Sequence, residues 1–178
     1  MSIEEPKYTI IKKHELFEIR EYLPFLVAQT KVTGKFEERG SKAFKILIKY
    51  ITGENQQQKS IKMTAPVIQE KNKNDFNSAI ISFVMPKSFS LDTLPSTLDK
   101  RITLRENPRK TVAVLKYSGG WTEQRYKEKE AILIKALKDA NIKIIGEANF
   151  ARYNSPFALS FMRRNEIMIK VQDHRGIA

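Results

Sequence analysis

Hydrophobic residues follow two kinds of period along this chain. Short runs alternate with polar residues, as expected of strands, whereas two longer stretches have the spacing of amphipathic helices. The helical stretches are 36–52, which ends at Gly53, and 121–141, for which Thr122 is the expected N-cap. Strands are predicted at 8–13, 16–22, 25–32, 61–67, 79–85, 101–106, 111–117, 144–153 and 166–171. This mixture predicts the α+β class.

Two of the predicted strands meet a proline. The run 61–64 alternates before Pro66, and the run that ends at Tyr153 is followed by Pro156. Proline has no N–H to donate to a strand ladder, so it ends, bulges or bends a strand, or lies on an edge. We expect Pro66 and Pro156 to bend equivalent strands in the two halves of the chain.

The second half of the chain repeats the order of elements in the first. Gly34 corresponds to Gly119 and Pro66 to Pro156, so the offsets are 85 and 90 residues. A strand–helix–strand–strand unit used twice, at about 7–86 and 100–171, is therefore predicted, with a connector at 87–98. A pseudo-twofold pairing of these units would form a distorted β-barrel flanked by two long helices, with a site at the seam.

The first helical stretch is apolar over roughly 200° of its surface, about twice the stripe that a helix needs to cover a sheet. The centre of this arc is formed by Phe36, Ala43, Leu47 and Ile51. Its edges are formed by Ile46 and Tyr50 on one side and by Phe44 and Ile48 on the other. Either protein covers both edges, or one edge is left for a ligand. The second helix is expected to turn inward Ile132, Ala136, Leu137 and Ala140.

Composition excludes several kinds of site. The chain has 178 residues, 41% of them hydrophobic, and no cysteine, so disulfides, thiolate metal sites and cysteine nucleophiles are excluded. His14 and His174 are the two imidazoles and stand near opposite ends. Residues 1–6 do not resemble a signal peptide, and no apolar run is long enough for a membrane span. We expect a cytoplasmic monomer with a loose tail at 172–178.

The net charge of +12 suits nucleic acid, an anionic membrane surface or an acidic small ligand. The cations are spread along the chain and no nucleic-acid-binding motif is recognisable, so a solvated surface accounts for most of them and nucleic acid is not an expected partner. An apolar helix edge with nearby cations suits a small, hydrophobic, anionic ligand.

Catalysis is not expected. The chain has no Gly-x-Ser-x-Gly elbow and no phosphate-binding glycine loop. Four strand-borne carboxylates could approach one another, but such groups are usually solvated or paired with a cation. They are Glu18, Glu21, Glu147 and Glu166.

Four short strings give the chain a family resemblance. They are IKMTAPV at 61–67, RRNE at 163–166, EIR at 18–20 and YSG at 117–119. From about Pro6 to Val171 the chain resembles the SOUL/haem-binding protein (HBP) family. The resemblance implies one SOUL-type domain over 1–178, with a duplicated fold similar to that of GyrI-like effector-binding domains.

The resemblance implies reversible, non-covalent binding of haem or a related tetrapyrrole in an apolar cleft beside the first helix, for buffering or transport. It implies no obligatory axial ligand, no metal site and no enzymatic activity. The cofactor-binding positions would be Phe44, Leu47, Ile48, Lys49 and Ile51, with Lys49 suited to a propionate. Ser41 and Leu159 stand where relatives can carry a basic residue.

Two alternatives remain open. One is a GyrI-like module that binds or sequesters small molecules without haem, although the charge of +12 disfavours cationic ligands. The other is an enzyme that acts on tetrapyrroles or small electrophiles.

Overall fold

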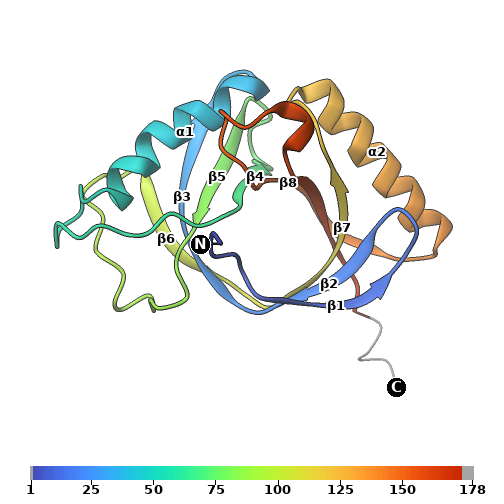
Figure 1. Ribbon diagram of the computed structural model, residues 1–178, viewed down its shortest axis with the longest axis horizontal. Helices are drawn as coiled ribbons and strands as arrows, with labels where there is room; N and C mark the ends of the chain where they lie inside the picture. Colours follow the sequence, from blue (N-terminus) through green and yellow to red (C-terminus); the bar gives the residue numbers. More distant parts are fainter. Residues whose placement is uncertain (1, 174–178) are drawn as a thin grey trace. The chain divides into compact units, whose positions relative to one another are not determined.

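The computed structural model describes residues 2–173, so His174 and most of the predicted tail lie outside the described residues. Nine strands and two long helices follow one another in the described chain, which confirms the α+β class (Figure 1). Their bounds are β1 Tyr8–Lys13, β2 Glu18–Tyr22, β3 Phe25–Thr33, α1 Phe36–Ile51, β4 Val67–Lys71, β5 Ser78–Val84, β6 Ile102–Asn107, β7 Lys110–Tyr117, α2 Glu123–Asp139, β8 Ile144–Arg152 and β9 Asn165–Val171, with a short 3₁₀ turn η1 at Ser160–Met162. No helix within residues 2–173 is long and apolar enough to cross a membrane.

The chain divides into two compact units, neither of which is continuous in sequence. The first unit contains Pro24–Pro108 and the N-terminal residues up to Pro6, and the second contains Lys7–Leu23 and the chain from Arg109 onward. Each unit has its own antiparallel strands and one long helix.

In the first unit the strands lie in the order β4-β5-β3-β6. Helix α1 packs against β3 and β5 (Figure 1). The core between helix and sheet is lined by apolar side chains from α1, β3, β5, β6 and the loops beside them. It includes Leu26, Ala28, Val32, Ala43, Leu47, Tyr50, Ile51, Ile61, Ala79, Ile81, Phe83, Met85, Leu94 and Ile102.

In the second unit the order is β8-β9-β7-β2-β1, and α2 packs against β7, β8 and β9. Tyr126, Leu133 and Leu137 are the buried residues of α2. The ring of Tyr126 is tilted against that of Phe150 on β8, with centroids 5.3 Å apart. Thr122 caps α2 as predicted, because its side chain accepts a hydrogen bond from the Arg125 N–H.

The strand–helix–strand–strand order occurs twice, as β3-α1-β4-β5 and β7-α2-β8-β9, and both sets of strands pair in the same spatial order. Each of these sets is extended by one strand from the other half of the sequence. Strand β6 precedes β7 in sequence but pairs with β3, and β2 precedes β3 but pairs with β7. The repeat boundaries at about 7–86 and 100–171 stay a prediction.

The segment 61–66 is not the strand that its alternation predicted. Strand β4 begins at Val67, after Pro66, and the peptide bond between Ala65 and Pro66 is cis. The segment's polar groups bond elsewhere. The Ile61 N–H donates to Ile51 O at the end of α1 at 2.7 Å, and the Thr64 hydroxyl donates to Val84 O at 2.5 Å. These bonds tie the segment to α1 and β5 and replace a strand ladder.

The two prolines do not occupy equivalent places. Pro66 lies just before β4, whereas Pro156 follows the end of β8 at Arg152. The expectation that they bend equivalent strands is therefore wrong, and their similar spacing reflects two different loops.

The inner face of α2 is only partly as predicted. Leu137 is buried, but Ile132 is 40% exposed and Ala140 is also exposed. Leu133 and Leu137 are one turn apart and set the buried face, and Ile132 is rotated from Leu133 by about 100°.

Candidate ligand-binding site

One edge of α1 carries two apolar side chains that the core covers only in part. Phe44 is 41% exposed, and its ring is tilted against Phe83 with centroids 5.7 Å apart. Ile48 is half-buried and packs against the core of the first unit. A spacing of four residues places both side chains on one face of the helix. The edge formed by Phe44 and Ile48 is the apolar edge of α1.

Two further predicted binding residues lie inside the first unit. Leu47 is fully buried and Ile51 is 4% exposed. Both belong to the core that holds α1 on β3 and β5. They support the apolar edge from behind and are not part of the exposed surface.

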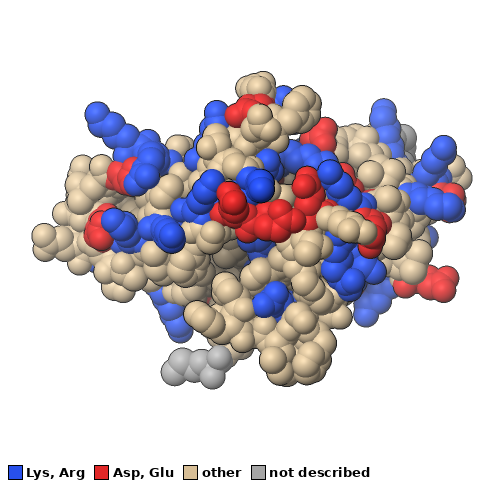
Figure 2. All heavy atoms as spheres, turned by 90° about the horizontal axis from the view of Figure 1, so that it is seen from above, with Lys and Arg blue, Asp and Glu red and all other residues tan. Residues whose placement is uncertain are grey.

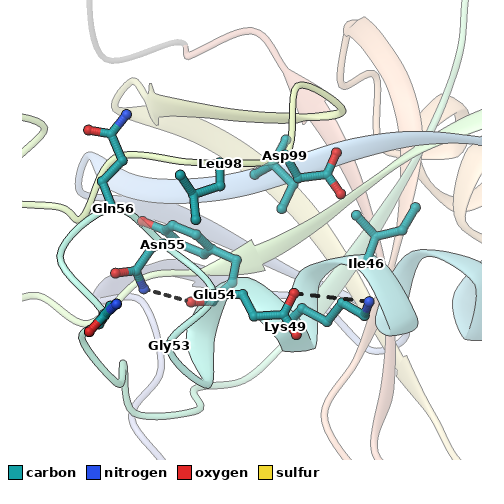
Figure 3. A pocket seen from close by; sticks show the side chains of 11 residues that line it. Ile46, Lys49, Gly53, Glu54, Asn55, Gln56, Leu98 and Asp99 are labelled. Carbon is teal, nitrogen blue, oxygen red and sulfur yellow. Dashed lines mark hydrogen bonds and ion pairs between the residues drawn. The ribbon is translucent and has the colours of Figure 1, made fainter.

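Lys49 faces a different side of α1 from Ile48, because successive helical residues are about 100° apart. Its side chain is 59% exposed, and its Nζ lies 4.0 Å from a carboxylate oxygen of Glu54. Figure 3 shows this pair at the C-terminal end of the helix. Lys49 therefore lines a pocket at that end of the helix. Phe44 and Ile48, which form the apolar edge, do not line this pocket.

This pocket, which we call the α1 pocket, has a volume of about 660 Å³ (Figure 3). It lies among the last turns of α1, the loop that follows, and the segment before β6. Its lining mixes apolar, amide and charged side chains. The residues are Ile46, Lys49, Tyr50, Gly53, Glu54, Asn55, Gln56, Gln58, Leu98, Asp99 and Ile102.

Asn55 makes one wall of the α1 pocket rigid. It is 1% exposed, and its amide donates to Tyr50 O at 2.9 Å and to Lys59 O at 2.8 Å. Its side-chain oxygen accepts the Lys59 N–H at 3.0 Å. The side chain therefore closes the loop after α1 onto the helix end, and Gly53, with a φ of +117°, permits the turn between them.

Two groups of the α1 pocket have shifted pKa values. Hydrogen bonds from Arg101 lower the pKa of Asp99 to about 2, so this carboxylate is ionised at neutral pH. Burial raises the pKa of Tyr50 to about 12, and its hydroxyl donates to Pro95 O at 2.7 Å. The pocket therefore offers two carboxylates, Glu54 and Asp99, beside the ammonium of Lys49.

The second unit contains a buried charged cluster. The Arg20 guanidinium donates to both carboxylate oxygens of Glu166, at 2.8 and 2.9 Å, and both side chains are fully buried. Arg20 also donates to Glu18 at 2.7 Å and to the Tyr22 hydroxyl at 2.8 Å. Arg164 donates to Glu166 from the opposite side at 3.0 Å. Glu18, Arg20, Tyr22, Arg164 and Glu166 form the Arg20 cluster.

Opposite charges keep the Arg20 guanidinium protonated. Burial alone would lower the pKa of Arg20, but the hydrogen bonds and charge of Glu166 outweigh it and raise that pKa. Burial raises the pKa of Tyr22 to about 12. Both carboxylates are engaged by guanidinium groups, so the cluster is a structural pairing and neither carboxylate is placed to act as an acid or base.

The other candidate groups lie apart from these sites. Glu21 pairs with Arg109 at 3.4 Å, and Glu147 is exposed on β8. His14 is half-buried and stacks on Phe17, with ring centroids 4.3 Å apart. Within residues 2–173, no three His, Asp or Glu side chains converge in a way that would hold a metal ion.

Both departures from the family pattern are exposed positions. The Ser41 hydroxyl donates to Glu38 O at 3.0 Å, and the Leu159 side chain is 60% exposed.

On the face shown in Figure 2, Lys and Arg side chains stand among Asp and Glu side chains. The excess of cations is therefore dispersed on that face.

Sequence reasoning missed the α1 pocket and the pairing of Arg20. The pocket residues at 53–56, 58 and 98–99 lie in polar loop and connector segments that carry no periodic signal. Arg20 lies two residues from both Glu18 and Tyr22, so the period of a strand places these three side chains on one face of β2. Its burial depends on Glu166, which is 146 residues further along the chain.

Comparison with known proteins adds sequence relatives. A family model described as "SOUL heme-binding protein" matches residues 3–170. The chain is 29% identical over 160 residues to a Homo sapiens protein named "Heme-binding protein 2", and the match covers 86% of this chain and 77% of that protein.

Solved structures extend the comparison to the fold. The EcmrR C-terminal domain aligns with a TM-score of 0.68 at 11% identity, covering 93% of this chain and 98% of that one. SAV2435 bound to tetraphenylphosphonium aligns with a TM-score of 0.53 at 11% identity, covering 88% and 93%. These likenesses concern the fold alone, and they confirm the predicted similarity to the fold of GyrI-like effector-binding domains.

Proposed function

Because the chain belongs to the SOUL heme-binding protein family, we propose that it binds haem or a related tetrapyrrole reversibly on the apolar edge of α1. The family and the curated relatives are named for binding a ligand, so the chain is classed as a binding protein and not as an enzyme. Reversible binding without a covalent bond suits buffering or transport of the ligand.

One structural observation supports this location. Phe44 remains 41% exposed on a helix whose neighbouring apolar positions are buried, and Ile48 extends the same edge by one turn. A flat porphyrin ring gains affinity by covering such side chains, since apolar contact area removed from water stabilises a complex. The rigid core residues Leu47 and Ile51 keep the edge fixed from behind.

Lys49 is proposed to interact with a propionate. Its Nζ makes a long, solvent-exposed contact with Glu54, and such pairs contribute little. The ammonium is therefore free to exchange Glu54 for a ligand carboxylate, and its flexible stem spans the angle between its own helix side and Ile48. No axial ligand is part of this proposal.

A haem titration followed at the Soret band tests this proposal. Phe44→Asp places a carboxylate on the apolar edge, and Lys49→Glu reverses the charge proposed for a propionate. Both variants are expected to weaken haem binding, Phe44→Asp by about tenfold or more.

The second helix provides matched controls. Ile134→Asp changes a residue that is 40% exposed, close to the 41% of Phe44, and Lys138→Glu reverses a last-turn lysine of α2 as Lys49→Glu does in α1. Both controls should bind haem as the wild type does. Absence of saturable binding by haem and by metal-free porphyrin, or equal losses in the controls, would contradict the proposal.

A second candidate is a small-molecule module that does not use haem. The α1 pocket favours it, because Glu54, Asp99 and several amides suit a polar or cationic ligand better than an apolar ring. The structure of SAV2435 with tetraphenylphosphonium shows one such ligand on a related fold. Calorimetric titration with tetraphenylphosphonium tests this candidate, and Asp99→Asn should weaken binding there while leaving a haem titration unchanged.

A further inference from the structure

The loop between β8 and β9 exposes an unusual concentration of large apolar side chains. Phe157 is 96% exposed, Leu159 60%, Phe161 71% and Met162 65%. These four residues, which we call the apolar tip, lie within six consecutive positions. Exposed apolar clusters of this kind mark interaction surfaces, whereas single exposed apolar residues are common and carry no such meaning.

The backbone beneath the apolar tip is held firmly. The Gly119 N–H donates to Ser160 O at 2.9 Å, and the Met162 N–H donates to Leu159 O at 2.9 Å. The Arg163 guanidinium donates to Pro156 O at 2.8 Å and to Ala158 O at 3.0 Å. The loop is therefore braced from both ends in a conformation that leaves its apolar side chains exposed.

Three arginines surround the base of the loop, and we call them the arginine collar. Arg163 and Arg152 lie over the ring of Trp121, with Cζ at 4.1 and 5.2 Å from its centroid. Arg125 donates to Ser118 O at 2.6 Å, immediately before the glycine that bonds to Ser160. Burial lowers the pKa of Arg152 to about 10, so it remains a cation at neutral pH.

Negative charge is scarce beside the collar. Residues 154–165 contain no Asp or Glu. The next acid, Glu166, is fully buried and already engaged by Arg20 and Arg164. On the first turn of α2, Glu123 pairs with Lys127 at 3.2 Å. The loop thus presents an apolar end above a cationic base.

We propose that the apolar tip inserts into the surface of an anionic lipid bilayer while two residues of the arginine collar, the half-buried Arg125 and Arg163, contact the lipid phosphates. Apolar side chains at the acyl boundary with cations at headgroup level are the arrangement by which proteins lie on membranes without crossing them. The near-complete exposure of Phe157 favours a lipid phase, which surrounds a protruding ring, over a flat protein surface, which covers one side of it.

Sedimentation with lipid vesicles tests the proposal on the full chain. Vesicles of phosphatidylcholine with phosphatidylserine are expected to bind the protein, and pure phosphatidylcholine vesicles are expected to bind it more weakly. Added salt should reduce the difference, because it screens the arginine collar. The double variant Phe157→Ser with Phe161→Ser should lower the partition coefficient by about tenfold or more.

Phe76→Ser is the matched control. Phe76 is 91% exposed, but it lies alone in a polar turn of the first unit. It should leave vesicle binding unchanged, and neither it nor the double variant should shift the thermal unfolding midpoint, because the substituted side chains are largely in water.

Trp121 gives a second, independent measurement. It is the single tryptophan of the chain and lies under two arginines of the collar. Vesicles that contain brominated phosphatidylcholine should quench its fluorescence in the wild type and not in the double variant.

Three results would overturn the proposal. The first is absence of binding to phosphatidylserine vesicles. The second is equal loss of binding in Phe76→Ser and in the double variant. The third is a dimer in analytical ultracentrifugation that the double variant dissociates, without any vesicle binding, because the tip would then serve contact between two copies of this chain.

Discussion

Some apolar residues of this protein are buried and stabilise the fold, whereas others remain exposed and can contact a partner. Within one helix, Leu47 and Ile51 are buried while Phe44 is 41% exposed. The apolar arc of α1 could be predicted from the sequence. The sequence could not show which of the two edges of this arc the rest of the protein covers. Tyr50 is held by Pro95, a contact that no local pattern reveals. The sequence therefore locates the helix that carries the candidate site, and tertiary contacts decide which side remains open.

The Arg20 cluster supplies a test at the scale of single residues. Glu166→Ala would leave the Arg20 guanidinium buried, and the carboxylate of Glu18 would compensate its charge only in part. Breaking a buried ion pair from one side costs about 3–5 kcal/mol. We expect a loss of this size in the free energy of unfolding, measured by urea denaturation.

The double variant Arg20→Met with Glu166→Met is the control for the unpaired charge of Arg20 that Glu166→Ala leaves in the interior. It removes both ions together, and apolar replacements of such pairs are often close to neutral. It should be clearly more stable than Glu166→Ala. If the two variants were equally unstable, packing and not an uncompensated charge would account for the loss.

Asp99 allows a test of pH dependence. Its pKa falls from 3.8 to about 2 on folding, because Arg101 binds the carboxylate. Because the pKa of Asp99 is lower in the folded than in the unfolded state, its ionisation stabilises the fold at pH values above the unfolded pKa. This contribution is lost as pH falls from about 4 to about 2. Since the Arg101 side chain of this pair is mostly in water, the contribution to stability is small.

The measurement compares wild type with Asp99→Asn in urea at several pH values. Wild type should be slightly more stable near neutral pH, and the difference should shrink below pH 4. A difference that grew on acidification would have the wrong sign and would contradict the assigned ion pair.

At the scale of elements, the period of the hydrophobic pattern was sufficient for most strands and for both helices. It failed at 61–66, where alternation imitated a strand. Alternation reports which side chains face inward, and Ile61 is indeed buried, but it does not report where the backbone finds its hydrogen bonds. That segment bonds to the end of α1 and to β5, both of which are set by tertiary structure.

The two helices differ at their N-termini, and this difference predicts a stabilising substitution. Thr122 caps α2 with its side chain, whereas Lys35 occupies the cap of α1 in extended backbone geometry without a side-chain bond. Lys35→Asp should supply the missing acceptor and a favourable charge at the helix end, and should stabilise the fold by about 0.5–1 kcal/mol.

Thr122→Ala should destabilise the fold by about 1 kcal/mol, and Thr122→Ser should restore most of that loss. Thermal unfolding of the variants measures both effects. If Thr122→Ser were as unstable as Thr122→Ala, the hydroxyl cap would not be the source of the difference.

At the scale of the whole molecule, the chain exchanges strands between its two halves. The repeat in element order could be read from the sequence, because each copy carries its own helix and its own strand pattern. The exchange could not, because β6 and β2 have the same alternation whichever strand they join. Each pairs with a strand of the other half by sequence order, β6 with β3 and β2 with β7.

This exchange predicts how fragments of the chain behave. A cut after Leu98, in the connector between the sequence halves, gives 1–98 and 99–178. The first fragment loses β6, which pairs with β3 from Phe25 to Thr30 and contributes Ile102 to the core. The second loses β1 and β2, and with them Arg20, so Glu166 has lost the partner that neutralises it. Neither fragment should fold alone, and mixing the two should restore native circular dichroism.

The fragment 24–108 is the matched comparison, because it keeps the four strands β3 to β6 and helix α1 together. It retains every residue of the core around Leu47, so a cooperative urea transition is expected for 24–108 and none for 1–98. The two fragments share residues 24–98, and the shorter fragment 24–98 differs from 24–108 only by the loss of 99–108, which contains β6, so 24–98 should also lack a cooperative transition. Cooperative unfolding of 1–98 by itself would show that β6 is dispensable, and the two halves would then fold as independent copies of the repeat.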